Sequence, residues 1–266
     1  MNATLTAIIL GIVEGLTEYL PVSSTGHLIL ATELLGYDAE RWALFNIAIQ
    51  PGAILAIVVL YWRTFWDVFT GMFRKDPSAF AFIRNLFVAF VPAVAIGLAL
   101  GDQIELLLEN AVVVAWALII GGIAILIVEH YARPTESGGV AGVTLRQSAL
   151  IGLVQCLAMV PGVSRSGATI LGAMSFGVDR KTAAEFSFFL AVPTLTGATV
   201  LQLAKHGEGL TRDQMGLIGI GFVVSFLVAI VVVKAFVAII TRIGFAPFAW
   251  YRIVAGTAAL IWLGAR

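Results

Sequence analysis

The sequence predicts an all-α polytopic membrane protein. It is expected to be an inverted repeat of two halves, each with one re-entrant helical hairpin and three transmembrane helices. Hydrophobic residues make up 60% of the 266 residues and charged residues 12%, with a mean hydropathy of +0.99, which is too apolar for a soluble domain. Six apolar runs are long enough to cross a bilayer, and two other apolar regions are each interrupted by a similar polar loop.

The six predicted spans follow from length and hydropathy alone. A helix needs about 20 predominantly apolar residues to cross a hydrocarbon layer of ~30 Å. The runs that satisfy this requirement are residues 42–61, 82–101, 111–131, 182–204, 214–240 and 247–263.

Residues 3–35 and 145–176 are also apolar, but the polar loops 21–27 and 161–167 divide them. Each half is too short to span the membrane comfortably. Irregular backbone at membrane depth is tolerated only where protein buries it or where it lines a wet cavity. We therefore expect two re-entrant hairpins with their loops inside the bundle, and the alternative is two ordinary kinked helices.

The two loops belong to a longer internal repeat, because an offset of 141 positions aligns matching residues along and beyond them. The aligned pairs include Gly11 and Gly152, Ser23 and Ser164, Gly26 and Gly167, and Phe45 and Phe186. Repeat one covers about residues 1–132 and repeat two about 143–266, within a single membrane domain of residues 1–266. Because three spans per half is an odd number, the second half is inverted, and such folds bind substrates where their broken helices meet.

Basic residues in the connections predict the orientation in the membrane. If the connection after residue 61 is cytoplasmic, nine basic residues lie on that side and four on the other, as the positive-inside rule requires. The nine are Arg63, Arg74, Lys75, Arg84, Arg133, Arg146, Arg180, Lys181 and Arg242, and the four are Arg41, Lys205, Arg212 and Arg266. The acidic connection with Asp102, Glu105 and Glu109 and both termini are then extracytoplasmic.

Charge and cysteine content exclude two other classes of protein. The formal net charge is zero and the chain has no basic block, so we expect membrane lipids and no nucleic acid as partners. The single cysteine, Cys156, excludes an internal disulfide framework.

Two carboxylates in the first hairpin indicate a functional site. Glu14 and Glu18 are four residues apart and share a helix face. An ionised carboxylate at the bilayer centre costs about 2.5 to 3.5 kcal/mol, so such a pair is expected to hold a divalent cation, Mg²⁺ or Ca²⁺, or a proton. The alternative is a pair of structural acids hydrogen-bonded in a wet crevice. The second hairpin has Gln155 and Met159 at these positions, so the acidic face belongs to one half only.

The second loop carries a positively charged side chain, because Arg165 stands where the first loop has Ser24. A guanidinium can grip phosphate oxygens with two parallel hydrogen bonds. It could also pair with Glu14 or Glu18, and the two roles are compatible. Hydroxyl groups cluster where each hairpin begins its second helix, and we expect them both to cap the helix and to bind an anion at its N-terminus. They are Ser23, Ser24 and Thr25 in the first loop, and Ser164, Ser166 and Thr169 in the second.

His27 directly follows the first loop and is the only one of the three histidines near either motif. A lone histidine can be structural, but the neighbouring serine and carboxylates favour a catalytic or substrate-contacting role. Carboxylates with a metal ion, an arginine, hydroxyl nucleophiles and helix N-termini are the components of a phosphoryl-transfer site.

Two stretches resemble the signature motifs of the undecaprenyl-diphosphate phosphatase family, also called the bacitracin-resistance protein family. They are residues 11–28, GIVEGLTEYLPVSSTGHL, and residues 161–169, PGVSRSGAT. Residues 50–56, 185–193 and 251–253 support the resemblance. It implies a multi-pass enzyme of the bacterial inner membrane that removes the terminal phosphate from undecaprenyl diphosphate. That reaction recycles the lipid carrier for cell-wall synthesis and confers bacitracin resistance.

The resemblance also implies roles for individual residues. Glu14 and Glu18 match the acidic pair associated with the divalent metal, Ser24 matches the serine proposed as nucleophile, and His27 matches a histidine proposed as nucleophile or acid–base group. Arg165 matches the phosphate-binding arginine, flanked by Ser164, Ser166 and Thr169.

A second class of function remains open, because inverted repeats with broken helices are also a transporter architecture. The alternative is a polyprenyl-phosphate flippase or transporter, alone or in addition to hydrolysis. A phosphatase built on paired histidines is disfavoured, since only His27 lies near the motifs. The sequence leaves open which membrane face the site opens to, and it is compatible with a homo-oligomer.

Overall fold

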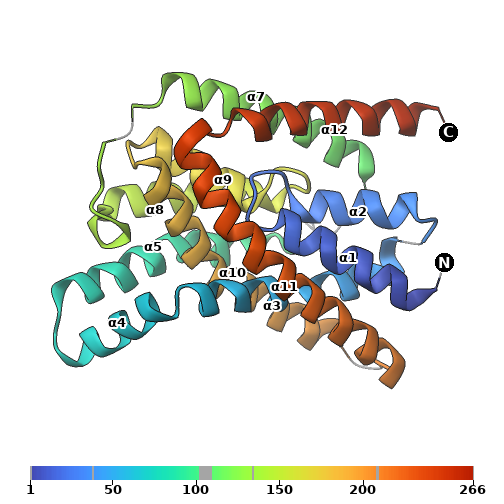
Figure 1. Ribbon diagram of the computed structural model, residues 1–266, viewed down its shortest axis with the longest axis horizontal. Helices are drawn as coiled ribbons and strands as arrows, with labels where there is room; N and C mark the ends of the chain where they lie inside the picture. The colour runs from blue at the N-terminus through green and yellow to red at the C-terminus, as the bar shows by residue number, and fades with distance from the viewer. Residues whose placement is uncertain (1, 38, 102–109, 134, 208–209, 266) are drawn as a thin grey trace.

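The computed structural model describes residues 2–37, 39–101, 110–133, 135–207 and 210–265. Within these residues, six helices are long and apolar enough to cross a membrane, which confirms the six predicted spans. They are the segment Trp42–Leu60 of α3 (Ala39–Leu60), α5 (Pro77–Ala99), α7 (Ala111–Tyr131), α10 (Arg180–His206), α11 (Arg212–Ile243) and α12 (Ala246–Gly264). They pack as a helical bundle with α7 and α12 side by side along one edge (Figure 1).

Three spans begin two or more residues earlier than hydropathy predicts, because capping residues rather than apolar residues set their ends. Asp76 caps α5, where its Oδ1 accepts from the Ser78 N–H at 2.9 Å and Pro77 takes the first helical position. The hydrogen bonds from the Ser78 backbone and hydroxyl also lower the pKa of the Asp76 carboxyl. Asp179 caps α10 and Thr211 caps α11 in the same way.

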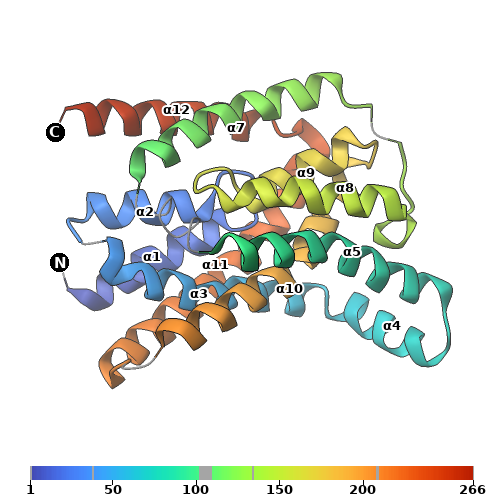
Figure 2. The same cartoon turned by 180° about the vertical axis from the view of Figure 1, so that it is seen from behind.

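The connection after residue 61 contains a helix that hydropathy does not predict, α4 (Trp62–Phe73). It was missed because twelve amphipathic residues are too few and too polar to register as a span. Aromatic side chains occupy its exposed face, namely Trp62, Trp66, Phe69 and Phe73. Figure 2 shows α4 lying against the first part of α5, at the opposite end of the bundle from the chain termini.

The two interrupted regions form hairpins rather than kinked helices. In the first, α1 (Ala3–Thr17) packs against α2 (Ser24–Leu34). In the second, α8 (Leu145–Gln155) leads through the 3₁₀ turn η2 (Cys156–Met159) to α9 (Arg165–Ser175). The hairpins enter from opposite ends of the bundle and their loops meet near its middle (Figure 1). This arrangement agrees with the predicted inversion, whereas the symmetry of the complete halves stays a prediction.

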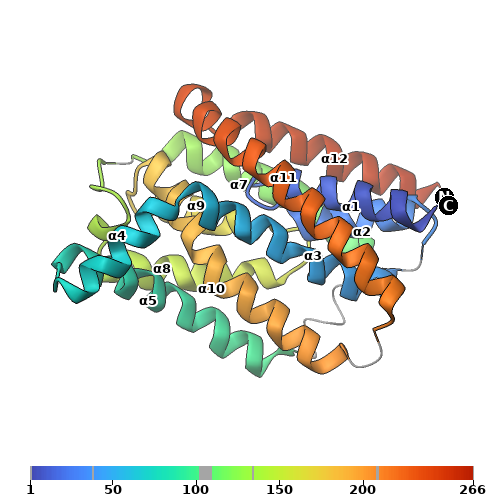
Figure 3. The same cartoon turned by 60° about the horizontal axis from the view of Figure 1, so that its bottom comes forward.

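Both termini lie at the same end of the molecule (Figure 3), as an even number of crossings requires. The turns after α4, after α9 and after α11 point toward the other end. Five of the nine basic residues counted above lie in or directly beside these turns, namely Arg74, Lys75, Arg180, Lys181 and Arg242. Asp102, Glu105, Glu109 and Arg266 lie outside the described residues.

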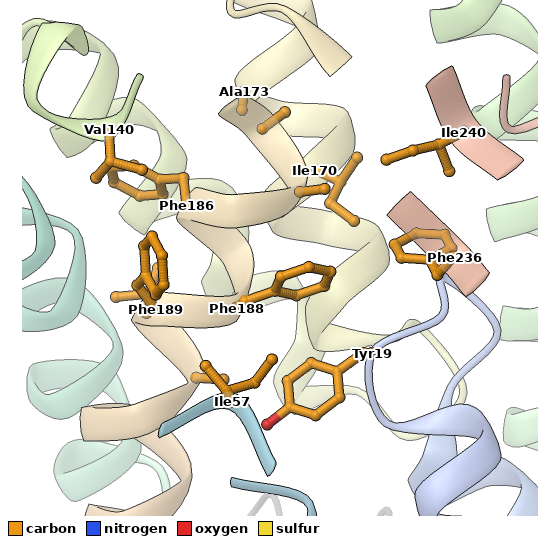
Figure 4. Packing of buried hydrophobic residues seen from close by; sticks show 14 of the residues in the cluster. Tyr19, Ile57, Val140, Ile170, Ala173, Phe186, Phe188, Phe189, Phe236 and Ile240 are labelled. Atoms are coloured by element: carbon orange, nitrogen blue, oxygen red, sulfur yellow. The ribbon is translucent and has the colours of Figure 1, made fainter. Parts of the chain in front are cut away.

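An aromatic core supports the loops from one side (Figure 4). Tyr19, at the end of the first hairpin's first arm, packs edge-to-face on Phe188 of α10 with ring centroids 5.3 Å apart. Its hydroxyl donates to the carbonyl of Ala53 at 2.9 Å, which satisfies the one polar atom of a fully buried ring. Phe236 of α11 contacts the other side of Phe188, so the core joins elements of both halves.

Candidate active site

The two loops have the same backbone geometry at the serine that caps the following helix. Ser23 has φ 73° and Ser164 has φ 79°, a region that few non-glycine residues occupy and that concentrates at functional sites. The Ser23 Oγ accepts from the Gly26 N–H at 3.3 Å, and the Ser164 Oγ accepts from the Gly167 N–H at 3.0 Å. The two loops therefore share the same local structure at this serine, whereas the repeat of the complete halves stays a prediction.

The loops touch each other and the side of α7. A Cβ added to Gly26 would lie 3.4 Å from the Cα of Gly162 and only 2.9 Å from Cγ1 of Val114. The Ser166 hydroxyl of the second loop donates to the Leu20 carbonyl of the first at 2.7 Å. Residues far apart in the sequence are thereby held in direct contact at the centre of the bundle.

Glu18 bridges the two loops. Its Oε1 accepts from Nη2 of Arg165 at 2.7 Å, and its Oε2 accepts from the Ser24 hydroxyl at 2.5 Å. Glu18 and Ser24 are 5% and 7% exposed, so this cluster is shielded from bulk solvent. A carboxylate that accepts from a serine hydroxyl is placed to remove its proton, and a guanidinium beside it can stabilise an anion.

Arg165 is positioned from α10 as well as by Glu18. Its Nη1 donates to the carbonyl of Ser187 at 2.7 Å, and the Ser187 Oγ accepts from Thr169 at 2.6 Å. The Arg165 Nε is buried and has no partner among the described residues. The predicted ion pair therefore exists, and Arg165 also lines the cavity described below.

Glu14 lies one helical turn before Glu18 in the chain, and its side chain is completely buried. Neither of its carboxylate oxygens accepts a hydrogen bond from an N–H or hydroxyl group of the described residues, and its polar neighbour is the Glu18 carboxyl group. Such oxygens need a proton or a cation. The described residues contain no group of three or more His, Cys, Asp or Glu side chains that could hold a metal ion. Mg²⁺ is often held by one or two carboxylates together with water and substrate phosphates, so the Glu14 and Glu18 pair fits it.

His27 points away from this cluster. Its Nδ1 lies 2.7 Å from the Ser23 carbonyl, which can only accept, so Nδ1 carries the proton. Its Nε2 lies 2.7 Å from the hydroxyl of Tyr251 on α12, and the two rings stack with centroids 5.5 Å apart. The structure thus brings Ser24, Glu18 and Arg165 together and places the His27 side chain against Tyr251 of α12 instead.

A cavity of about 740 Å³ opens from the cluster. Its polar end includes Glu18, Ser23, Ser24, Thr25, Ser164 and Arg165, and its other walls come mainly from apolar residues of α5 and α10. The predicted substrate-binding residues Ser166 and Thr169 are not among the lining residues. They bond to Leu20, Ser187 and their own loop instead, so they support the loops.

The chain matches a known protein family over most of its length. Residues 7–258 match the family model described as Bacitracin resistance protein BacA. The chain belongs to this family.

Named members of the family are similar to the chain over its whole length. The undecaprenyl-diphosphatase of Novosphingobium aromaticivorans is 59% identical and covers 100% of both chains. That of Sphingopyxis alaskensis is 57% identical over 99% of both, and that of Rhizorhabdus wittichii is 56% identical over 98% of both.

Several residues around the site of this bacitracin resistance family member carry no signal of their place in the sequence. Gln50 and Gln155 line the cavity, and the Ser187 carbonyl accepts a hydrogen bond from Arg165. Ser187 lies in the stretch 185–193 noted for its resemblance, yet a serine in an apolar helix carries no signal of its role until its partner is placed next to it. Arg252 was likewise noted only as part of a triplet.

Proposed function

We propose that the chain hydrolyses undecaprenyl diphosphate to undecaprenyl phosphate and inorganic phosphate, and so recycles the lipid carrier for cell-wall synthesis and confers bacitracin resistance. The names of its full-length relatives support this activity. The single observation that carries the proposal is the bridge from Glu18 to both Ser24 and Arg165 at the polar end of a cavity with apolar walls. An amphiphile with a charged head and an isoprenoid tail fits such a cavity.

In the proposed reaction, the Ser24 Oγ attacks the terminal phosphorus while Glu18 takes the hydroxyl proton. The bond from that phosphorus to the bridging oxygen breaks, and Glu18 passes the proton to the departing undecaprenyl phosphate. Water then attacks phosphorylated Ser24, Glu18 takes a proton from that water, and the serine oxygen leaves with a proton as inorganic phosphate is released. Arg165 and the N–H groups at the starts of α2 and α9 stabilise the negative charge on the transferred group.

Glu14 and Glu18 would hold the divalent cation, Mg²⁺ or Ca²⁺. When bound, such an ion neutralises charge on a diphosphate and polarises its phosphorus–oxygen bonds. The unpartnered oxygens of Glu14 support this placement.

We further propose that the site opens to the extracytoplasmic side of the bacterial inner membrane. The cavity reaches Gly101 beyond α5 and Lys205 near the end of α10. This is the end at which both termini lie, opposite the end with Arg74, Lys75, Arg180, Lys181 and Arg242. The positive-inside rule makes the basic end cytoplasmic, so the cavity mouth and both termini face outward.

Phosphate release from purified protein in detergent tests the proposal. We expect release of inorganic phosphate from undecaprenyl diphosphate that requires a divalent cation and is lost in Ser24→Ala at normal expression and stability. A flippase or transporter would instead move lipid between the leaflets of a vesicle without releasing phosphate. Size-exclusion chromatography with light scattering would test the predicted homo-oligomer on the same samples.

A further inference from the structure

Arg252 of α12 occupies the point where both loops meet α7. It is 1% exposed, and among the described residues it pairs with no carboxylate. Instead its guanidinium donates to five backbone carbonyl groups. They belong to Pro21 at 3.0 Å, Val163 at 3.0 Å, Gly162 at 2.9 Å, Ala117 at 3.0 Å and Leu118 at 3.2 Å.

These five bonds use all five N–H donors of an arginine side chain. Pro21 belongs to the first loop, Gly162 and Val163 belong to the second, and the other two carbonyls belong to α7. Carbonyl groups of non-helical backbone need donors at membrane depth, and water does not reach this point freely. One side chain therefore accounts for hydrogen bonds to carbonyl groups of both loops, without itself lining the cavity.

The surrounding backbone leaves a space shaped for this guanidinium. A Cβ added to Gly121 of α7 would collide with the guanidinium of Arg252. A Cβ added to Gly167 would lie 3.3 Å from its Nη1, and Gly162 has φ +90°, where a side chain is strained. Glycine is thus present where the arginine crosses α7 and where it approaches the second loop.

We propose that Arg252 is a positioning residue for hydrolysis. By holding the Pro21 and Val163 carbonyls at once, it sets the separation at which Glu18 reaches both Ser24 and Arg165. Arg252 is not among the residues that line the cavity, so it acts through the loops and not on the substrate. The proposal rests on the assignment of Ser24 and Arg165 as reacting groups.

Two variants test this role in different ways. Arg252→Lys keeps the charge but supplies at most three donors from one point, and Gly121→Ala keeps the arginine but removes the space that it occupies. The matched controls are Arg180→Lys, which can keep the ion pair with Glu129 at the far end of the bundle, and Gly216→Ala, whose added Cβ meets no described atom within 4 Å. The kcat and KM for undecaprenyl diphosphate are measured in detergent, per folded molecule, with the melting temperature recorded for each variant.

We expect both variants to lower kcat by roughly 30- to 100-fold while KM changes less than about threefold, because a displacement of about 1 Å at reacting groups can cost 10²-fold. The two controls should stay within about twofold of the parent. A variant with an unchanged kcat per folded molecule would overturn the proposal. So would a loss of activity that merely follows the loss of folded protein.

A double variant separates positioning from an independent effect. Arg165→Lys removes one of the groups that Arg252 positions, so adding Gly121→Ala to it should lower kcat by less than about threefold more. If kcat of the double variant falls by the full product of the factors measured for Arg165→Lys and Gly121→Ala, Arg252 does not act through this site. If the parent protein releases no phosphate, the proposed function fails; if Arg165→Lys alone retains full activity, the site assignment fails.

Discussion

Oε1 of Glu18 lies 2.7 Å from Nη2 of Arg165, although the two residues are 147 positions apart in the chain. The other oxygen of the same carboxylate accepts a hydrogen bond from the Ser24 hydroxyl, so one side chain connects the guanidinium of the second loop with the serine hydroxyl of the first. This contact makes the site depend on the assembly of both hairpins.

Replacement of Glu18 is expected to affect both the chemistry and the metal, whereas replacement of Glu14 is expected to affect the metal alone. Glu18→Gln removes the base for Ser24 and should lower kcat by at least about 100-fold at saturating cation, within the range for lost general-base catalysis. Glu14→Gln should mainly raise the Mg²⁺ or Ca²⁺ concentration that gives half-maximal activity. Activity is titrated with each cation, and the kcat at saturating cation distinguishes the two variants. An equal loss of kcat at saturating cation in both would contradict the separate role of Glu18 as base.

Arg165→Lys should lower activity by roughly 100-fold or more. The guanidinium of Arg165 binds Glu18 and Ser187 at the same time, and in the proposed reaction it also contacts the phosphate. A single ammonium group cannot reproduce this planar arrangement of donors. The measurement is phosphate release per folded molecule, with Arg180→Lys as the matched control. Activity of Arg165→Lys near that of the parent would refute the assignment of this arginine.

Ser24 and His27 are distinguished by the covalent intermediate. We expect phosphate to be trapped on Ser24, because its hydroxyl faces the cavity and Glu18 while both ring nitrogens of His27 are engaged behind the loop. His27→Asn, which can still donate to the Ser23 carbonyl, should retain at least about a tenth of the parent kcat if His27 only orders the loop. Mass spectrometry of acid- or base-quenched enzyme identifies the bond, since phosphoserine survives acid and phosphohistidine does not. A phosphorylated His27 would reverse the assignment.

Gly52 is expected to matter for stability alone. A Cβ at this position of α3 would collide with the carbonyl of Phe222 on α11, so Gly52→Ala should destabilise the fold by about 1 to 3 kcal/mol. Gly216→Ala, in a helix with open space around it, should be neutral or slightly stabilising. Thermal unfolding in detergent compares the two. Equal melting temperatures would mean that the α3 and α11 crossing can relax at no cost.

The sequence predicted the parts of the fold that depend on local composition. Hydropathy located the six spans, and the repeated motif located the two loops and the residues Glu18, Ser24 and Arg165 that meet there. It did not reveal α4, whose length is below that of a span. Nor did it assign roles to Ser187 and Arg252, because their partners in this structure are largely backbone carbonyls, and every residue type presents the same carbonyl. The orientation of His27 depends in the same way on Tyr251, 224 positions away.

The division of the site between the loops has a consequence for the chain as an assembly. A fragment that ends after α7 would contain Glu14, Glu18 and Ser24 but no guanidinium beside them, and the remaining fragment would contain Arg165 and Arg252 but neither carboxylate nor nucleophile. Neither piece could work by itself. Two separately produced pieces should regain hydrolysis only when they associate in the same membrane, so the return of activity would report directly on the docking of one half against the other.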